Sequence, residues 1–163
     1  MPSRSVFNVL RAFKSSMCEV LLFCLLAAVP ALAQPPHLVI REDRGGPLEA
    51  RLARVETLRQ EGRAVAIPEG RCLSACTLYL GLEETCVGKA AIFGFHGPTT
   101  QFGTIALPQA EFERLSALMA RRYPEPLREW FLLSARFHTL TYRYVTGEEL
   151  IRLGVAECPD QID

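Results

Sequence analysis

The sequence predicts an α/β fold in a single, disulfide-stapled domain, residues 38–163. Short apolar runs rich in β-branched residues alternate with segments in which apolar residues recur every three or four positions. Two such runs flank the first amphipathic segment at the spacing of a βαβ unit, which implies short parallel strands and a right-handed crossover. The first 33 of the 163 residues are set apart below as a signal peptide. The remaining 130 residues are enough for one hydrophobic core and too few for two domains.

The N-terminal segment, residues 1–33, has the pattern of a cleavable signal peptide. Three basic residues precede an apolar run, 20–32, which ends in the small-x-small tripeptide Ala31-Leu32-Ala33. The run is shorter than the about 20 apolar residues that cross a bilayer. We therefore expect a periplasmic or secreted mature chain. The alternative is an uncleaved N-terminal membrane anchor.

A proline-rich stretch, residues 34–37, is expected to form a flexible leader before the first strand, 38–40. The turn that follows contains Gly45 and Gly46, and Pro47 suits the first position of a helix. Apolar residues then recur at helical spacing until Gly62: Leu48, Leu52, Val55 and Leu58. Residues 64–67 form the second strand of the βαβ unit.

The later elements alternate in the same way. A short helix is expected from near Ser74 to Leu82, and Thr146 with Glu149 has the capping-box pattern of a last short helix that Gly154 ends. The remaining predicted elements are strands at 86–87, 90–95 and 140–145 and helices at 110–122 and 126–135.

Four cysteines follow Ala33: Cys72, Cys76, Cys86 and Cys158. An even number in an exported domain predicts two disulfides, and four cysteines allow three connectivities. We favour Cys76–Cys86 with Cys72–Cys158, because the second bridge would tie the C-terminal tail to the centre of the domain. The absence of a Cys-x-x-Cys pair and the scattered histidines favour disulfides over a metal site. We therefore expect no metal and no cofactor.

The charge balance argues against a nucleic-acid partner. Three of the 18 basic and one of the 18 acidic residues precede residue 34, so the rest of the chain carries 15 basic and 17 acidic residues, a net charge of −2. No basic stripe and no motif of base-stacking aromatic residues is present.

Three features follow successive predicted strands: the Gly45–Gly46 pair, Ser74 and His96. In open parallel sheets, ligands bind at the carboxyl ends of the strands. A serine at a strand-to-helix turn exposes its hydroxyl together with unpaired backbone N–H groups, and a nearby histidine can take its proton. Spacing alone favours a simpler interpretation, in which Ser74 is a helix N-cap and His96 a turn residue bonded to the backbone.

Four segments carry a family resemblance: residues 39–46, the Gly70-x-x-x-Ser74-Ala-Cys segment, Phe95-His96-Gly97-Pro98, and residues 146–155. In order and spacing they resemble the proteolytic subunit of Clp protease and its crotonase relatives, the ClpP/crotonase-like superfamily. The resemblance implies Ser74 as nucleophile and His96 as general base, with an oxyanion hole formed by the N–H groups of Gly46 and Ala75.

The resemblance departs from the family at the triad acid. The family's aspartate falls at about Tyr142, so Tyr142 or a backbone carbonyl would have to orient His96. The implied function is an exported, possibly peptidase-like serine hydrolase acting on a peptide or small ester, compatible with a homo-oligomer. The alternative is a catalytically inactive binding or scaffold domain of the same fold. An exported compartment normally lacks ATP, so no ATP-driven unfoldase is expected as a partner.

Overall fold

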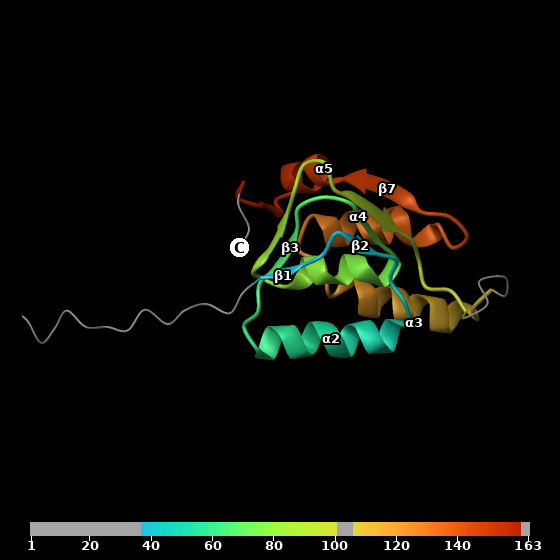
Figure 1. The fold of residues 1–163 in the computed structure, drawn as a ribbon. Coiled ribbons are helices and arrows are strands. Elements are labelled where there is room, and N and C mark those ends of the chain that lie inside the picture. Colours follow the sequence, from blue (N-terminus) through green and yellow to red (C-terminus); the bar gives the residue numbers. More distant parts are fainter. Residues whose placement is uncertain (1–36, 101–105, 161–163) are drawn as a thin grey trace, which may run out of the picture. The chain divides into compact units, whose positions relative to one another are not determined.

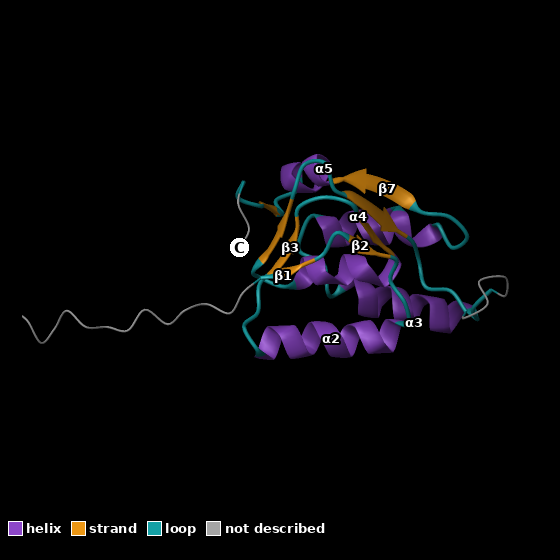
Figure 2. Ribbon diagram, in the orientation of Figure 1, coloured by secondary structure: helices purple, strands orange, loops and turns teal. Residues whose placement is uncertain are grey.

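The computed structural model describes residues 37–100 and 106–160 of the chain. The predicted signal peptide, 1–33, and the leader residues 34–36 lie outside the described residues. The described residues belong to one compact unit of mixed α/β structure. It contains two sheets, in which most strand pairs are parallel (Figures 1 and 2).

Short strands come in consecutive pairs, and the two members of a pair belong to different sheets. The first sheet contains, in spatial order, β1 (Leu38–Val39), β3 (Val65–Ile67), β5 (Thr85–Val87) and β8 (Ala156–Glu157), all parallel. The second sheet contains β2 (Glu42–Asp43), β4 (Arg71–Leu73), β6 (Ile92–Phe95) and β7 (Arg143–Thr146). Its first three strands are parallel, and β7 runs antiparallel to β6.

Helical segments connect the strand pairs, except for the last one, which lies between the two strands of the last pair. They are α2 (Leu48–Gln60), the 3-10 helix η1 (Ser74–Gly81), α3 (Gln109–Ala120), α4 (Leu127–Leu133), the 3-10 helix η2 (Ala135–Phe137) and α5 (Gly147–Arg152). In Figure 1, α2 runs alongside η1 and contacts it, and α3 contacts α4. None of the helices in the described part of the chain is long and apolar enough to cross a lipid bilayer.

The core lies between the strands and these helices. Strand β3 is buried along its whole length, as expected for a continuous apolar run inside a parallel sheet. From α2, Val55 and Leu58 are fully buried, whereas Leu48 and Leu52 pack against the core from its margin. The largest buried side chains include Phe93, Phe95, Leu78, Tyr123, Phe131 and Leu150.

The predicted βαβ unit is confirmed, because β1 and β3 pair in parallel on either side of α2. The capping box is also confirmed: Thr146 Oγ1 accepts from the Glu149 N–H, and the Glu149 carboxylate accepts from the Thr146 N–H. Three strands were not predicted, namely β2, β4 and β8. Each has only two or three residues and includes a charged side chain, so none shows an apolar strand pattern. The strand expected at 140–145 begins only at Arg143.

Both disulfides form, but the expected pairing is wrong: the bridges are Cys72–Cys76 and Cys86–Cys158. The chain turns from β4 into η1 at Ser74, and this turn brings the α-carbons of Cys72 and Cys76 within 5.3 Å. The unpredicted strand β8 lies beside β5, and the Cys158 N–H donates to the Val87 carbonyl at 3.0 Å. Cys158 therefore meets Cys86. Two disulfides indicate an oxidising environment.

Removing the long-range bridge should destabilise the protein more than removing the short one. By the chain-entropy treatment, a bridge between residues 72 apart contributes about 4 kcal/mol, and one between residues 4 apart about 2 kcal/mol. We expect Cys86→Ala/Cys158→Ala to unfold at clearly lower urea concentration than Cys72→Ala/Cys76→Ala. Equilibrium urea unfolding of both double variants checks the order, and equal losses would contradict it.

Candidate active site

The candidate site lies at one edge of the second sheet. Gly45–Gly46, Ser74 and His96 follow the carboxyl ends of β2, β4 and β6, which are neighbouring parallel strands. The sequence placed the three features at a common edge but did not predict two of the strands that carry them there. They converge because neighbouring parallel strands end on the same side of a sheet.

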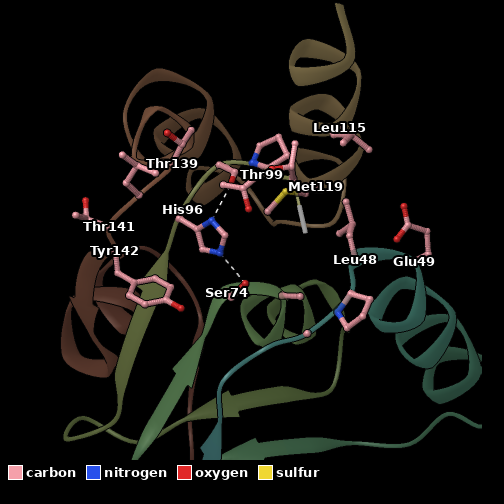
Figure 3. Close-up of a pocket in the computed structure, with 17 residues that line it drawn as sticks. Leu48, Glu49, Ser74, His96, Thr99, Leu115, Met119, Thr139, Thr141 and Tyr142 are labelled. Atoms are coloured by element: carbon pink, nitrogen blue, oxygen red, sulfur yellow. Dashed lines mark hydrogen bonds between the residues drawn. The ribbon is translucent and has the colours of Figure 1, made fainter. Parts of the chain in front are cut away.

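Ser74 and His96 are in direct contact. The Nε2 atom of His96 lies 2.6 Å from the Ser74 hydroxyl, and its Nδ1 atom lies 2.6 Å from the Gly97 carbonyl oxygen (Figure 3). A carbonyl oxygen only accepts hydrogen bonds, so Nδ1 carries the proton in this tautomer. The unprotonated Nε2 of a neutral imidazole then accepts from the Ser74 hydroxyl. This is the arrangement in which a histidine can act as general base on a serine.

Burial lowers the pKa of His96 below its ordinary value of 6.5, and the hydrogen bond to the Gly97 carbonyl opposes this shift in part. Burial penalises the charged imidazolium, because that form loses more hydration than the neutral ring. The ring is therefore neutral at pH 7, the state that a general base needs.

This direction of shift predicts a pH dependence. A general base must be neutral, so if the Ser74–His96 pair hydrolyses esters, kcat/KM should stay level from about pH 8 to 7 and fall only as pH drops through a pKa below 6.5. A pH profile of ester hydrolysis between about pH 4.5 and 8.5, the range in which histidines titrate, measures this dependence. An apparent pKa above 6.5 would contradict the conclusion that burial lowers the pKa of His96.

The backbone holds Ser74 in an unusual conformation. Its φ is +57°, the left-handed region, which no other non-glycine residue in the described part of the chain adopts. The Cys72–Cys76 disulfide spans the turn, and Thr77 Oγ1 donates to the Ser74 carbonyl at 2.8 Å. Buried Tyr123, whose pKa is raised by burial, donates to Thr77 Oγ1 at 2.8 Å. Such strain persists only where the surrounding structure enforces it.

The helix-cap interpretation of Ser74 does not describe this geometry. Ser74 is the first residue of η1, the capping residue is Leu73, and no side chain caps the helix. The Ser74 hydroxyl is hydrogen-bonded to His96 instead.

Gly46 and Ala75, whose N–H groups the resemblance assigns to an oxyanion hole, line the same pocket as Ser74. Ala75 lies in the first turn of η1, where N–H groups have no carbonyl partner within the helix. Gly46 has a φ of +128°, and its N–H has no hydrogen-bond acceptor among the described residues. Gly45, which precedes Gly46, packs tightly against the serine turn: a Cβ there would lie 2.9 Å from the Ala75 nitrogen. Both N–H groups come from residues that line the same pocket as Ser74 and His96.

The pocket over Ser74 and His96 has a volume of about 800 Å³ and two unlike walls. One wall carries the apolar side chains of Leu48, Leu115 and Met119, with the Glu49 carboxylate beside Leu48, and the opposite wall carries Thr139, Thr141 and Tyr142 (Figure 3). His96 lies between them. An acyl group and a polar leaving group bound across the Ser74 hydroxyl would each meet a matching wall.

Tyr142 contacts His96 but does not accept its Nδ1 proton. The two rings meet edge to face with centroids 5.3 Å apart, and the tyrosine ring also covers Gly94. The acceptor for Nδ1 is the Gly97 carbonyl. The Gly97 N–H in turn donates to the His138 carbonyl at 2.9 Å, which anchors the segment to the end of η2. A backbone carbonyl is the alternative to Tyr142 that the sequence leaves open, and no pattern of residue types identifies which carbonyl it is.

Within residues 37–100 and 106–160, no three histidine, cysteine or acidic side chains gather in a way that could hold a metal ion. No protein-family model matches the chain, and none of the curated proteins matches its sequence.

Proposed function

We propose that this protein is an exported serine hydrolase in which Ser74 is the nucleophile and His96 the general base. The observation that carries the proposal is the 2.6 Å contact between His96 Nε2 and the hydroxyl of a serine whose φ is +57°. A strained serine at the start of a helical turn, bonded to a neutral histidine and open to a pocket, has few structural uses.

In the proposed reaction, Ser74 Oγ bonds to the carbonyl carbon of the substrate while its proton passes to His96 Nε2. The carbonyl electron pair moves to the oxygen, which accepts hydrogen bonds from the N–H groups of Gly46 and Ala75. Collapse of this intermediate breaks the bond to the leaving group, and His96 returns the proton to it. Water then attacks the acyl-Ser74 ester by the same steps and releases the acid.

The substrate proposed for this site is a peptide or a small ester. The apolar wall suits an acyl part with a hydrophobic side chain, and the hydroxyl wall suits a leaving group that forms hydrogen bonds. The pocket is large enough for a few residues of a peptide or a compact ester.

We extend the proposal to the family. The three resembling segments at the site each contain the end of one of three adjacent parallel strands. Their order along the chain and their common sheet edge support this part of the proposal. Export rests on the N-terminal sequence pattern and agrees with the two disulfides.

A binding or scaffold role for the same fold remains the second candidate, and one observation favours it. Both ring nitrogens of His96 are engaged, by Ser74 and by the Gly97 carbonyl, so no carboxylate supports the imidazolium that forms during acylation. A neutral carbonyl stabilises that cation less than a carboxylate does, and losing the acid costs about 10⁴-fold in turnover in an established triad.

A fluorophosphonate probe separates the two candidates. It reacts with activated serines, so it should label the oxidised protein and leave an adduct on the peptide that contains Ser74. Mass spectrometry after proteolysis locates the adduct. An unlabelled wild-type protein would rule out the hydrolase and leave the binding domain.

A further inference from the structure

A charged pair, Asp43 and Arg51, contacts the glycine turn, and neither residue belongs to the pocket lining. The Asp43 carboxylate receives both terminal nitrogens of Arg51, at 2.9 Å on Oδ1 and 2.8 Å on Oδ2. It also accepts the Gly45 N–H at 2.8 Å. Arg51 donates in addition to the Gly45 carbonyl at 3.0 Å. The pair therefore holds both backbone polar groups of Gly45.

The pair is shielded and rigid. The side chains of Arg51 and Asp43 are only 12% and 20% exposed. The guanidinium carbon lies 4.6 Å above the ring centre of Tyr79, a buried residue of η1. A bidentate pair stacked on an aromatic face has one geometry, and a lysine could not reproduce it.

Holding the Gly45 carbonyl also directs the next N–H group. The Gly45–Gly46 peptide bond is trans, since the one cis bond among the described residues is Glu125–Pro126. In a trans peptide the C=O and N–H point in opposite directions. With the Gly45 carbonyl bound to Arg51, the Gly46 N–H faces away from Arg51, and Gly46 lines the pocket.

We infer that Arg51, together with Asp43, is a positioning device that keeps the Gly46 N–H aimed at the oxyanion of the transition state. A glycine pair with φ of +92° and +128° has little intrinsic preference for one peptide orientation. Without Arg51, the Gly45–Gly46 peptide can rotate and withdraw its N–H from the pocket. The inference rests on the proposed hydrolase function.

The test compares Arg51→Met with Arg54→Met in the full-length oxidised protein. Arg54 is an exposed residue on the same helix, one turn further along, so it controls for the lost charge and for the new side chain. With p-nitrophenyl butyrate as substrate, Arg51→Met should lower kcat about 10²–10³-fold, the effect of losing one oxyanion donor. Its KM should change less than about threefold, since the donor acts in the transition state. Arg54→Met should match the wild type.

Arg51→Lys keeps the positive charge but loses the two-pronged guanidinium that binds both Asp43 oxygens. Its kcat should lie between those of Arg51→Met and the wild type. Thermal unfolding of all three variants shows whether the fold is kept. Unchanged kcat in a folded Arg51→Met, or a loss that appears only as a raised KM, would overturn the inference while the hydrolase stands. A wild-type protein that neither hydrolyses the ester nor reacts with a fluorophosphonate would overturn both.

Discussion

Ser74→Ala should lose all fluorophosphonate labelling and all ester hydrolysis, because no other hydroxyl in the described part of the chain is bonded to His96. His96→Ala should keep the hydroxyl but lower kcat about 10²–10⁴-fold, the usual contribution of a positioned general base. The effects should not add in the double variant, since the two side chains act as one unit. Stopped or continuous assays of p-nitrophenyl ester hydrolysis measure both losses.

Matched controls are available for both positions. Ser134 is a half-buried serine outside the pocket, and His138 is a half-buried histidine whose ring lies 3.5 Å from Thr141 rather than at Ser74. Ser134→Ala and His138→Ala should therefore retain activity. If His138→Ala were as damaging as His96→Ala, the assignment of the base would be wrong. Residual labelling of Ser74→Ala would point to another nucleophile.

Gly45→Ala should distort the turn that carries Ser74 and lower both stability and turnover. The added Cβ would lie 2.6 Å from the Ser74 Cβ and 2.9 Å from both the Ala75 nitrogen and the Leu73 carbonyl oxygen. All three atoms belong to the turn that carries the nucleophile, so relief of the overlap must displace it. The overlap and the φ of +92° together should cost about 2–6 kcal/mol of unfolding free energy.

Gly62→Ala is the control for the backbone strain alone. Gly62 has a φ of +59° at the end of α2, and a Cβ there would meet nothing within 4 Å. Gly62→Ala should lower the free energy of unfolding by only about 1–2 kcal/mol, the penalty for a non-glycine residue in the left-handed conformation, and leave turnover unchanged. Urea unfolding and ester hydrolysis of the two variants measure the difference. A Gly45→Ala protein as stable and active as Gly62→Ala would show that the turn does not need its glycine.

The larger elements were predictable from local pattern. The helix from Leu48 follows from apolar residues at helical spacing, and the last helix follows from the capping box at Thr146. The strands with continuous apolar runs, such as β3, were also found. In contrast, β2 and β4 consist of residues such as Glu42 and Arg71, whose extended conformation comes from pairing with neighbouring strands.

For the disulfides, the number of bridges could be predicted from the sequence but the pairing could not. An even number of cysteines in a chain with an export pattern predicted two bridges, and two bridges form. Their partners depend on which strands lie side by side. Without β8 beside β5, nothing in the sequence indicated that Cys158 would reach Cys86.

The α/β class and the order of the glycine pair, Ser74 and His96 at successive turns could be read from the sequence, because they depend on residue type and on position along the chain. How these residues meet depends on the packing of the sheet. Neighbouring parallel strands bring His96 Nε2 to 2.6 Å from the Ser74 hydroxyl, and the Gly97 carbonyl takes the place where an acid would stand. The bond from Arg51 to the Gly45 carbonyl was equally invisible. Backbone groups carry no residue identity, so which of them faces a side chain is decided by the packing of distant segments.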